Sequence, residues 1–200
     1  MNDYQFTKDW FHWAPDIWTH LIPMLPERRE GGREFLEIGS FEGRSAVWIM
    51  ENMMQDGDHL TCVDTWEGGE EHSAEDMEAV HARFCHNMEV AQAKFTERHY
   101  SSVHYYSIAQ LSAAISECME YDFIYIDGSH IAKDVLTDAC MAWPLLKKGG
   151  IMVFDDYLWG NARDILHRPK LAVDAFSSIF AEELEVIHTG YQFIVRKKGE

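Results

Sequence analysis

The sequence predicts an α/β protein in which a mostly parallel sheet is covered by helices on both faces. Segments of strand-forming apolar residues alternate along the chain with segments whose apolar residues recur every three or four positions. The expected strands are apolar throughout, which is typical of strands buried on both faces of a parallel sheet. Two short apolar runs near the C-terminal end, joined through Thr189 and Gly190, predict a closing antiparallel hairpin.

Three strand and helix pairs are expected before residue 120. The clearest helix begins near Asp76, because apolar residues from Met77 to Phe95 recur at steps of three and four. The expected strands span 34–38, 59–64 and 102–106, and the helical patterns that follow them cover 46–53, 77–95 and 108–119.

The second part of the chain continues the alternation. FIYI at 123–126 reads as a buried strand, and a helical pattern over 131–146 follows it. Pro144 is expected to end or kink that helix early, and KKGG at 147–150 is interpreted as its stop signal. The remaining elements are expected as a strand at 151–156, a helix near 170–181 and closing strands at 184–188 and 191–195.

Composition and charge exclude several classes of protein. Thirty-four acidic against seventeen basic residues give a net charge of −17, which opposes binding to nucleic acid or to an anionic membrane surface. No apolar run approaches the ~20 residues of a membrane span and no signal-peptide pattern is present, so a cytoplasmic protein without membrane contact is expected. The scattered cysteines form no C-x-x-C pair, which indicates neither a zinc cluster nor a disulfide scaffold.

The chain is expected to divide into residues 1–30 and a single domain over 31–200. The first segment, rich in Trp, Phe and Pro, is interpreted as an accessory helix or lid. Its aromatic side chains either contact a substrate or a second subunit, or belong to a lid or to the core, and His72 in the acidic loop has the same open roles. A homodimer or a higher homo-oligomer is compatible with this reading. The aromatic residues in question are Trp10, Phe11, Trp13 and Trp18.

Polar residues with functional chemistry follow four of the predicted strands. A single Asp or Gly at the end of a strand is usually an ordinary loop residue. However, parallel strands bring their carboxyl ends to one rim of the sheet, where open α/β sheets bind their ligands. The joint occurrence therefore predicts one site, built from Glu37, Gly39 and Gly43, from Asp64, from Asp127 and His130, and from Asp155 and Asp156.

The first of these strand ends indicates a nucleoside cofactor other than NAD. The segment from Glu37 to Gly43 reads ExGxxxG and lacks the second glycine of G-x-G-x-x-G, which admits a pyrophosphate close to the backbone. Asp64 ends the second strand, where an acid is well placed to accept hydrogen bonds from ribose hydroxyls.

Three blocks of the sequence, FLEIGSFEGRSAVWI, LTCVDTWEG and FIYIDGSH…PLLKKGGIMVFDDY, resemble the class I S-adenosylmethionine-dependent methyltransferases. They are most similar to the small branch that contains catechol-type and antibiotic-sugar O-methyltransferases, and they span roughly residues 34–157. The resemblance implies a Rossmann-like, doubly wound sheet of seven strands with an antiparallel last strand. It also implies methyl transfer from S-adenosylmethionine to a hydroxyl group of a small molecule.

The resemblance further implies which residues bind the cofactor. Asp64 would hold the ribose, and Glu37 would lie near the amino end of the methionine part. Trp66 would pack against the adenine or, equally, cap the core. Ser107 occupies the position after the third strand where the family often contacts adenine through an acid or amide. The implied cofactor site is completed by Gly39, Ser40 and Gly43 beneath the methionine part and by Asp127.

Catechol-type members hold a magnesium ion with acids at the ends of the fourth and fifth strands, which implies a Mg²⁺ site at Asp127, Asp155 and Asp156. The chemistry agrees, because three carboxylates in one crevice repel one another and an oxygen-seeking divalent cation relieves that repulsion. His130 is the implied general base, since sugar-type members carry a histidine at this place. The alternative for His130 is a structural or exposed histidine.

Two other functions compete with methyl transfer. A metal-dependent hydrolase could use Asp127, His130 and the acids at 155 and 156 around an activated water, but it leaves the glycine turn and Asp64 unexplained. A non-catalytic module could retain the cofactor pocket without the chemistry, and turnover would distinguish it. His81, Cys85 and His86 are not expected to bind metal, because they lie beside the apolar stripe of an amphipathic helix.

Overall fold

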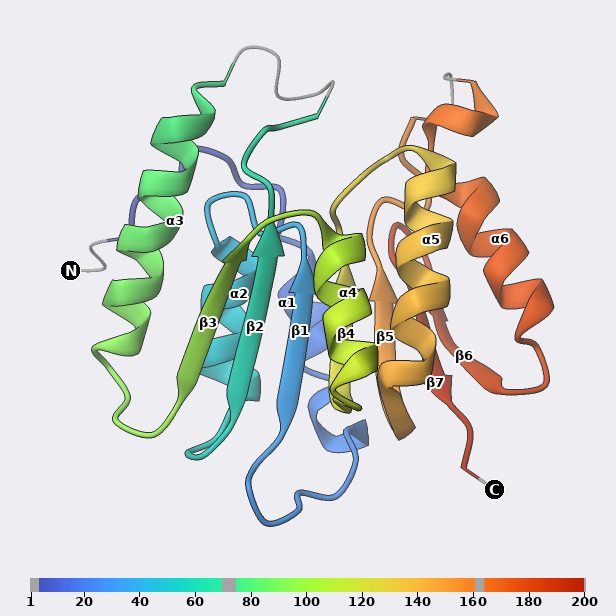
Figure 1. Cartoon of the computed structure of the whole chain (residues 1–200), viewed down its shortest axis with the longest axis horizontal. Helices are drawn as coiled ribbons and strands as arrows, with labels where there is room; N and C mark the ends of the chain where they lie inside the picture. The colour runs from blue at the N-terminus through green and yellow to red at the C-terminus, as the bar shows by residue number, and fades with distance from the viewer. Residues whose placement is uncertain (1–3, 70–74, 161–163, 200) are drawn as a thin grey trace.

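Seven strands form one sheet in the order β3-β2-β1-β4-β5-β7-β6 (Figure 1). The computed structural model describes residues 4–69, 75–160 and 164–199, and the structural statements below refer to these residues. The strands from β3 to β5 pair in parallel, whereas β7 is antiparallel to both β5 and β6, which confirms the predicted Rossmann-like sheet and its closing hairpin. The strands are β1 Glu34–Ile38, β2 His59–Asp64, β3 His99–His104, β4 Tyr121–Ile126, β5 Leu146–Phe154, β6 Leu184–Thr189 and β7 Phe193–Lys197.

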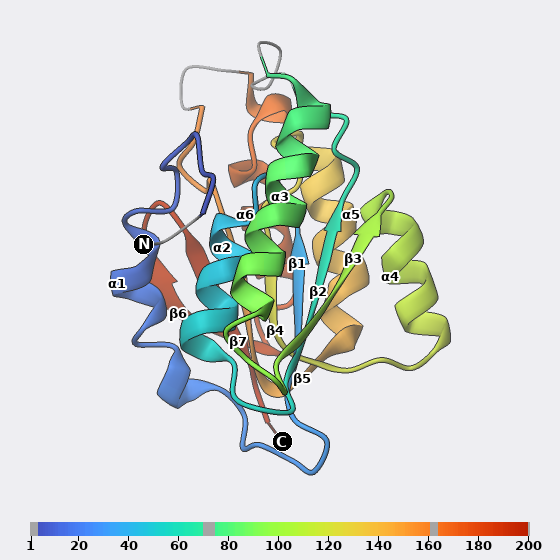
Figure 2. The same ribbon diagram turned by 90° about the vertical axis from the view of Figure 1, so that its left-hand side faces the viewer.

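Helices cover both faces of this sheet (Figure 2). Helices α1, α2 and α3 pack on one face, and α4, α5 and α6 pack on the other. Among the described helices, none is both long and apolar enough to cross a membrane. The helices are α1 Ala14–Trp18, α2 Arg44–Trp48, α3 Met77–Gln92, α4 Ser107–Ser116, α5 Ala132–Ala142 and α6 Lys170–Ile179, with short helical turns at Ile22–Met24, Ile49–Met53, Trp143–Leu145 and Ile165–His167.

The two apolar cores follow from the alternation of side chains along buried strands. In β1, Phe35 belongs to the core on the α1–α3 side and Leu36 to the core on the α4–α6 side, and both are fully buried. Phe123 and Ile124 divide in the same way in β4. Because both faces must be apolar, these strands read as continuous hydrophobic runs, which is the pattern that predicts a parallel sheet.

Helix α3 is the element that the apolar periodicity predicts most clearly. The side chain of Asp76 accepts a hydrogen bond from the backbone amide of Ala79 and so caps the first turn. Val80, Phe84 and Met88 are fully buried on the side that faces the sheet. Helix α3 ends at Gln92, before the predicted last member of the stripe at residue 95.

Strand β3 begins and ends earlier than the sequence indicates, over residues 99–104 instead of 102–106. It pairs in register with β2, so that His99 lies opposite His59 and His104 opposite Asp64. This edge strand contains no fully buried residue, and an apolar run therefore cannot mark its limits. Tyr105 and Tyr106, which were expected inside the strand, lie beyond its end.

The expected helix over 131–146 and its KKGG stop were partly wrong. Helix α5 ends at Ala142, and a short helical turn containing Pro144 follows, because proline has no amide hydrogen with which to continue the helix. The residues of KKGG belong to β5, which starts at Leu146. The pairing of β5 with β4 shifts register between Tyr121 and Phe123, so the extra residues of β5 form an irregular, bulged segment.

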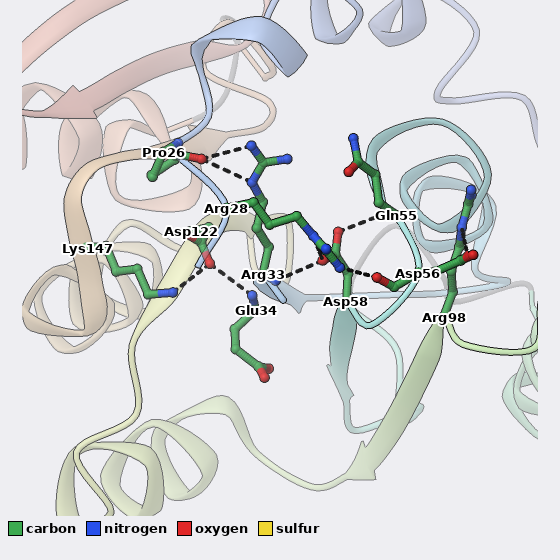
Figure 3. A network of polar contacts seen from close by, with 10 residues as sticks. All are labelled: Pro26, Arg28, Arg33, Glu34, Gln55, Asp56, Asp58, Arg98, Asp122 and Lys147. Atoms are coloured by element: carbon green, nitrogen blue, oxygen red, sulfur yellow. Dashed lines mark hydrogen bonds and ion pairs between the residues drawn. The ribbon is translucent and has the colours of Figure 1, made fainter. Parts of the chain in front are cut away.

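Ion pairs fix the loops at the end of the sheet where β1, β2 and β4 begin (Figure 3). Asp58 is fully buried, and it accepts hydrogen bonds from Arg28 Nε at 3.0 Å and from the backbone amide of Arg33 at 2.8 Å. Asp122 accepts from the amide of Glu34 at 2.9 Å and from Lys147 Nζ at 2.7 Å. These buried acids are fully paired, which explains charged residues at otherwise apolar strand starts.

The segment before β1 is packed onto the α1–α3 face of the sheet. Trp18 is fully buried, and its ring lies 5.3 Å from that of Phe123 and 4.8 Å from that of Tyr125, measured between centroids. Nearer the N-terminus, Thr7 donates two hydrogen bonds to the carboxylate of Glu42, from its backbone amide at 2.6 Å and its hydroxyl at 2.7 Å. One end of this segment thus enters the core, and the other is bound to the loop between β1 and α2.

Candidate functional site

A cavity of about 950 Å³ lies at the carboxyl ends of β1, β2, β4 and β5. Parallel strands direct their carboxyl ends to this rim, so residues far apart in the sequence meet here. Glu37, Gly43 and Trp66 are close to the cavity in the fold but do not line it. The predicted residues that line it together are Gly39, Ser40, Asp64, Ser107, Asp127, His130, Asp155 and Asp156.

The turn after β1 depends on Gly39. Its φ of +87° lies in the left-handed region that favours glycine, and a Cβ atom there would lie 2.1 Å from the carbonyl oxygen of Asp127. The amide of Asp127 in turn donates to the carbonyl of Ile38 at 2.7 Å. Gly39 therefore lets the ends of β1 and β4 approach each other closely enough to share one cavity wall.

Asp64 joins the end of β2 to this glycine turn. Its Oδ2 accepts from the backbone amides of Ser40 at 2.8 Å and Phe41 at 2.9 Å, and its Oδ1 accepts from the amide of Trp66 at 2.7 Å. An ionised carboxylate offers about four acceptor positions. Asp64 thus retains capacity to accept from about one further donor, such as a ribose hydroxyl.

Glu37 lies beneath the turn and is fully buried. The hydroxyls of Ser40 and Ser45 each donate to its carboxylate at 2.6 Å. Burial raises the pKa of Glu37 to about 7, and the nearby charge of Asp64 adds to this effect. In the structure Glu37 therefore supports the turn from below, and direct contact with a cofactor stays a prediction.

Trp66 lies in the core, which is the alternative to an adenine contact that the sequence analysis left open. The side chain is only 5% exposed, its Nε1 donates to the carbonyl of Phe41 at 2.9 Å, and its ring packs between His81 and Phe84 of α3. This is the packing of a core tryptophan that braces the glycine turn. Cys85 Sγ lies 3.5 Å from His81 Nε2 on the same helix.

Ser107 begins α4 at the cavity wall. Its hydroxyl donates to Asp138 Oδ1 at 2.6 Å, and Asp138 also lines the cavity. Burial raises the pKa of Asp138 to about 6. The sequence analysis missed Asp138, because it lies in the middle of α5, where an acid is usually interpreted as part of a solvated face.

Asp127 and Asp155 meet at the hydroxyl of Tyr125. Tyr125 Oη lies 2.9 Å from Asp127 Oδ2 and closer still to Asp155 Oδ2. Burial raises the pKa of Asp127 well above its usual range, with further contributions from the charges of Asp155 and Asp156. Burial, followed by the charge of Asp156, raises the pKa of Asp155 to about 6. The cluster thus resists carrying three negative charges.

His130 and Asp156 form the open side of the same cluster. His130 Nε2 lies 2.5 Å from Asp156 Oδ2, and the imidazole stacks on Trp159 with centroids 4.0 Å apart. One ligand atom from each of Asp127, His130 and Asp156 lies within 4.8 Å of the others. The trio closest to metal-binding geometry among the described residues thus contains His130, whereas the sequence analysis placed Asp155 in it.

The donor set fits a divalent cation. Tyr125 has one hydroxyl hydrogen but lies between two carboxylate oxygens, so one of these contacts requires a proton on an acid or a compensating positive charge. Carboxylate oxygens are the ligands that Mg²⁺ prefers, and an imidazole nitrogen extends the set to other divalent metals. Burial is the main cause of the raised pKa values of Asp127 and Asp155, and a cation of this kind would relieve the mutual repulsion that adds to it.

The sequence analysis missed two polar residues of this cluster, Tyr125 and Gln192, although the sequence contains a pattern that indicates each of them. Tyr125 lies two positions before Asp127, and residues two apart in a strand share a face. Gln192 interrupts the apolar closing run YQFIV, yet it is fully buried and donates to Asp155 Oδ2 at 3.1 Å. A polar residue inside an apolar strand indicates a buried hydrogen-bond partner.

An aromatic wall lies beside the acid cluster and lines the same cavity. The N-terminal segment contributes Trp10, which packs on Phe41 with centroids 5.0 Å apart, and Trp13, which contacts Tyr191 edge to face at 5.3 Å. These side chains, with His12, Trp159 and His167, line the cavity. His72, which the sequence left open as a contact residue, lies outside the described residues.

Comparison with known proteins identifies the family. A family model described as a methyltransferase domain matches residues 36–157. A comparison with curated proteins finds no match. Several solved structures share the fold at sequence identities below 25%.

Three of these solved structures illustrate the likeness. An O-methyltransferase from Bacillus cereus in complex with SAH is 17% identical with a TM-score of 0.59, over 99% of this chain and 94% of that chain. TomG from Streptomyces achromogenes, an O-methyltransferase of tomaymycin synthesis in complex with SAM, is 18% identical with a TM-score of 0.63, over 93% and 80%. MycE of the mycinamycin pathway, in complex with Mg, SAH and mycinamycin VI, is 14% identical with a TM-score of 0.58, over 97% and 51%.

The family match spans more than half of the chain and includes the glycine turn, Asp64 and the acid cluster. The chain therefore belongs to the methyltransferase-domain family and is an S-adenosylmethionine-dependent methyltransferase.

Proposed function

We propose that this protein transfers a methyl group from S-adenosylmethionine to a hydroxyl oxygen of a small molecule, with a divalent cation bound at the acid cluster. The observation that carries the proposal is the meeting of two groups of residues in one cavity. The turn at Gly39 with Asp64 suits a nucleoside cofactor, and the acids at Asp127, Asp155 and Asp156 suit a cation. A hydrolase would use only the second group.

The turn side of the cavity is where we place the cofactor. Asp64 has capacity to accept from about one further donor, and Gly39 and Ser40 present backbone close to the cavity without bulky side chains. Ser107 and Asp138 are the polar groups at the α4 side of the same cavity. We assign them to the adenosine end, opposite the acid cluster.

The acid cluster is where we place the cation and the acceptor hydroxyl. S-adenosylmethionine, when bound, would supply an electrophilic methyl group, and a divalent cation held by the acids would lower the pKa of an acceptor hydroxyl. Asp127 and Asp156 offer ligand atoms to the cation, with Asp155 fixed beside them by hydrogen bonds. At the open side of the cluster, the ring nitrogen of His130 that is not hydrogen-bonded to Asp156 accepts the proton that the hydroxyl loses.

A small acceptor with a flat or partly apolar ring suits the aromatic wall. Trp10, Trp13 and Tyr191 offer ring faces and edges, which bind apolar and aromatic surfaces well. The net charge of −17 disfavours nucleic acid as the acceptor. Some proteins of similar fold act in the synthesis of small molecules, as TomG does for tomaymycin, which supports the same class of acceptor. Within the predicted accessory segment 1–30, we place the described residues 4–30 as the part that closes this side of the cavity.

Calorimetric titration of S-adenosylhomocysteine and of Mg²⁺ tests the two halves of the proposal separately. Asp64→Ala is expected to lose binding of the nucleoside, because the substitution removes the proposed ribose acceptor and the three hydrogen bonds that the carboxylate accepts from backbone amides. Asp155→Asn is expected to keep nucleoside binding and to lose Mg²⁺ binding. Glu67→Gln, at another acid that lines the cavity, serves as the matched control and should change neither.

The outcomes separate the competing functions. Wild-type protein that binds no S-adenosylhomocysteine would contradict the cofactor assignment. Unchanged turnover in Asp155→Asn would remove only the cation from the proposal. Tight binding of both ligands without methyl transfer to any hydroxyl compound would favour a non-catalytic module.

A further inference from the structure

We propose that Gln192, held in place by Trp18, is a positioning residue that fixes Asp155 within the cation site. The inference rests on the proposed function, since it concerns how the cation is bound. It gives a role in the site to two residues outside it, a core tryptophan of the N-terminal segment and a glutamine beside the closing hairpin. Neither residue lines the cavity.

Two hydrogen bonds in series connect Trp18 to the acid cluster. Trp18 Nε1 donates to Gln192 Oε1 at 2.7 Å, and Gln192 Nε2 donates to Asp155 Oδ2 at 3.1 Å. Trp18 and Gln192 are both fully buried. Water therefore does not compete for the bond between Trp18 and Gln192, and burial makes the loss of a partner costly.

Chemistry dictates the orientation of the Gln192 amide. An indole nitrogen is a donor only, so Trp18 can be satisfied only by the amide oxygen of Gln192. The amide nitrogen must then face the other way, toward Asp155. Trp18 thus makes Gln192 a donor to Asp155 and prevents the flipped amide, which would set two oxygen acceptors against each other.

The Gln192 bond completes a set that immobilises the Asp155 carboxylate. Asp155 Oδ2 also accepts a hydrogen bond from the hydroxyl of Tyr125, and Asp155 Oδ1 accepts one from the backbone amide of Asp156 at 2.7 Å. Asp156 has a φ of +56°, a left-handed backbone conformation that residues other than glycine seldom adopt. Fixing Asp155 therefore also holds the turn from which the Asp156 carboxylate reaches His130.

Packing alone does not account for a glutamine at this place. Its chain neighbours Phe193 and Ile194 are buried and apolar, and a leucine or methionine would fill similar volume without two buried polar atoms. Burying an amide costs free energy unless each polar atom is bonded. The partner that Gln192 binds besides Trp18 is the acid of the cation site, where neighbouring groups that orient a ligand control its affinity.

Calorimetric titration with Mn²⁺, in the presence of saturating S-adenosylhomocysteine, tests the inference in the full chain. Gln192→Leu removes both hydrogen bonds and is expected to weaken Mn²⁺ binding about 10- to 100-fold, the usual effect of losing a residue that orients a metal ligand. Trp18→Phe keeps an aromatic ring but removes the indole donor and so frees the amide, and it should weaken binding by less. The double variant should lose little more than Gln192→Leu alone, because both changes act through the same bond.

Controls separate positioning from stability. Ile194→Val changes a fully buried apolar residue of β7, two positions after Gln192, and it should leave Mn²⁺ affinity unchanged. Binding of S-adenosylhomocysteine should stay within about twofold of wild type in every variant that melts cooperatively. If Gln192→Leu does not fold, Trp18→Phe carries the test.

Three results would overturn the inference. Mn²⁺ affinity in Gln192→Leu within twofold of wild type, with only the melting temperature lowered, would reduce the residue to packing. Additive losses in the double variant would separate Trp18 from Gln192. Wild-type protein that binds the nucleoside but no cation would reject this inference while leaving the cofactor assignment intact.

Discussion

The buried carboxyl group of Glu37, beneath the glycine turn, makes the stability of the folded protein depend on pH. Ser40 and Ser45 hold it beneath the turn, and burial raises its pKa to about 7 from its usual value of 4.5. Between these two values the folded protein binds more protons at this position than the unfolded chain does. The free energy of unfolding must therefore fall as pH rises through this window.

Glu37→Gln should remove this dependence on pH. A pKa displaced by roughly 2.5 units corresponds to a change in unfolding free energy of about 3 kcal/mol. We expect the variant to gain that much stability relative to wild type as pH rises from 4.5 to 7, with no further gain above that range. Urea unfolding at intervals of half a pH unit measures it, and parallel curves for the two proteins would contradict it. The raised pKa values of Asp127 and Asp155 act in both proteins and largely cancel, because the charge of Glu37 is only a minor cause of the raised pKa of Asp127.

His130 is assigned as the base, although its geometry also allows a role as metal ligand. As a base, its replacement by alanine should lower kcat about 10²- to 10⁴-fold and leave Mn²⁺ affinity unchanged. His167→Ala, at another histidine of the cavity wall, is the matched control and should retain most activity. A loss of Mn²⁺ affinity in step with kcat would make His130 a ligand instead.

Among the elements, the N-terminal segment is the one most closely bound to the loop between β1 and α2. Glu42 in that loop is 2% exposed and accepts two hydrogen bonds from Thr7 and one from Arg83 Nε at 2.5 Å. Although burial raises it, the bonds from Thr7 and the charge of Arg83 leave the pKa of Glu42 below its usual range. The N-terminal segment, which contributes to the aromatic wall, is thus joined by hydrogen bonds to the loop that contains the glycine turn.

Removing the charge of Glu42 should loosen this junction. Glu42→Gln is expected to lower the free energy of unfolding by about 1.5–3 kcal/mol, the range for hydrogen bonds to charged groups. Glu51→Gln is the comparison, because the Glu51 pair with Lys94 is partly exposed and such pairs contribute about 0–1 kcal/mol. Urea unfolding measures both, and equal effects would contradict the structural role given to Glu42.

The limits of the elements show where sequence patterns stop being informative. Buried strands such as β1 and β2 have the predicted bounds, because both faces demand apolar residues. The edge strand β3 lacks buried residues, so pairing with β2 sets its limits. The KKGG segment reads locally as a helix stop, but it lies in β5 because Lys147 pairs with Asp122 and the strand pairs with β4.

For the whole molecule, topology accounts for most of the site that the sequence predicted. Placing strand ends on one rim brings Asp64, Asp127 and Asp155 to one cavity, which a pattern of buried strands is enough to predict. The sequence could not reveal contacts between distant elements. Gln192 reaches Asp155 from the hairpin, and Trp18 reaches Gln192 across the core.

Methyl transfer from labelled S-adenosylmethionine to a panel of small vicinal diols, with and without chelator, tests the central claim most directly. The claim is that the cofactor turn and the acid cluster serve one reaction at a hydroxyl group. We expect a product labelled on oxygen, lost on addition of EDTA and restored by excess Mg²⁺. Labelled product that forms equally well under chelation, or no O-methylated product from protein that binds S-adenosylhomocysteine, would contradict it.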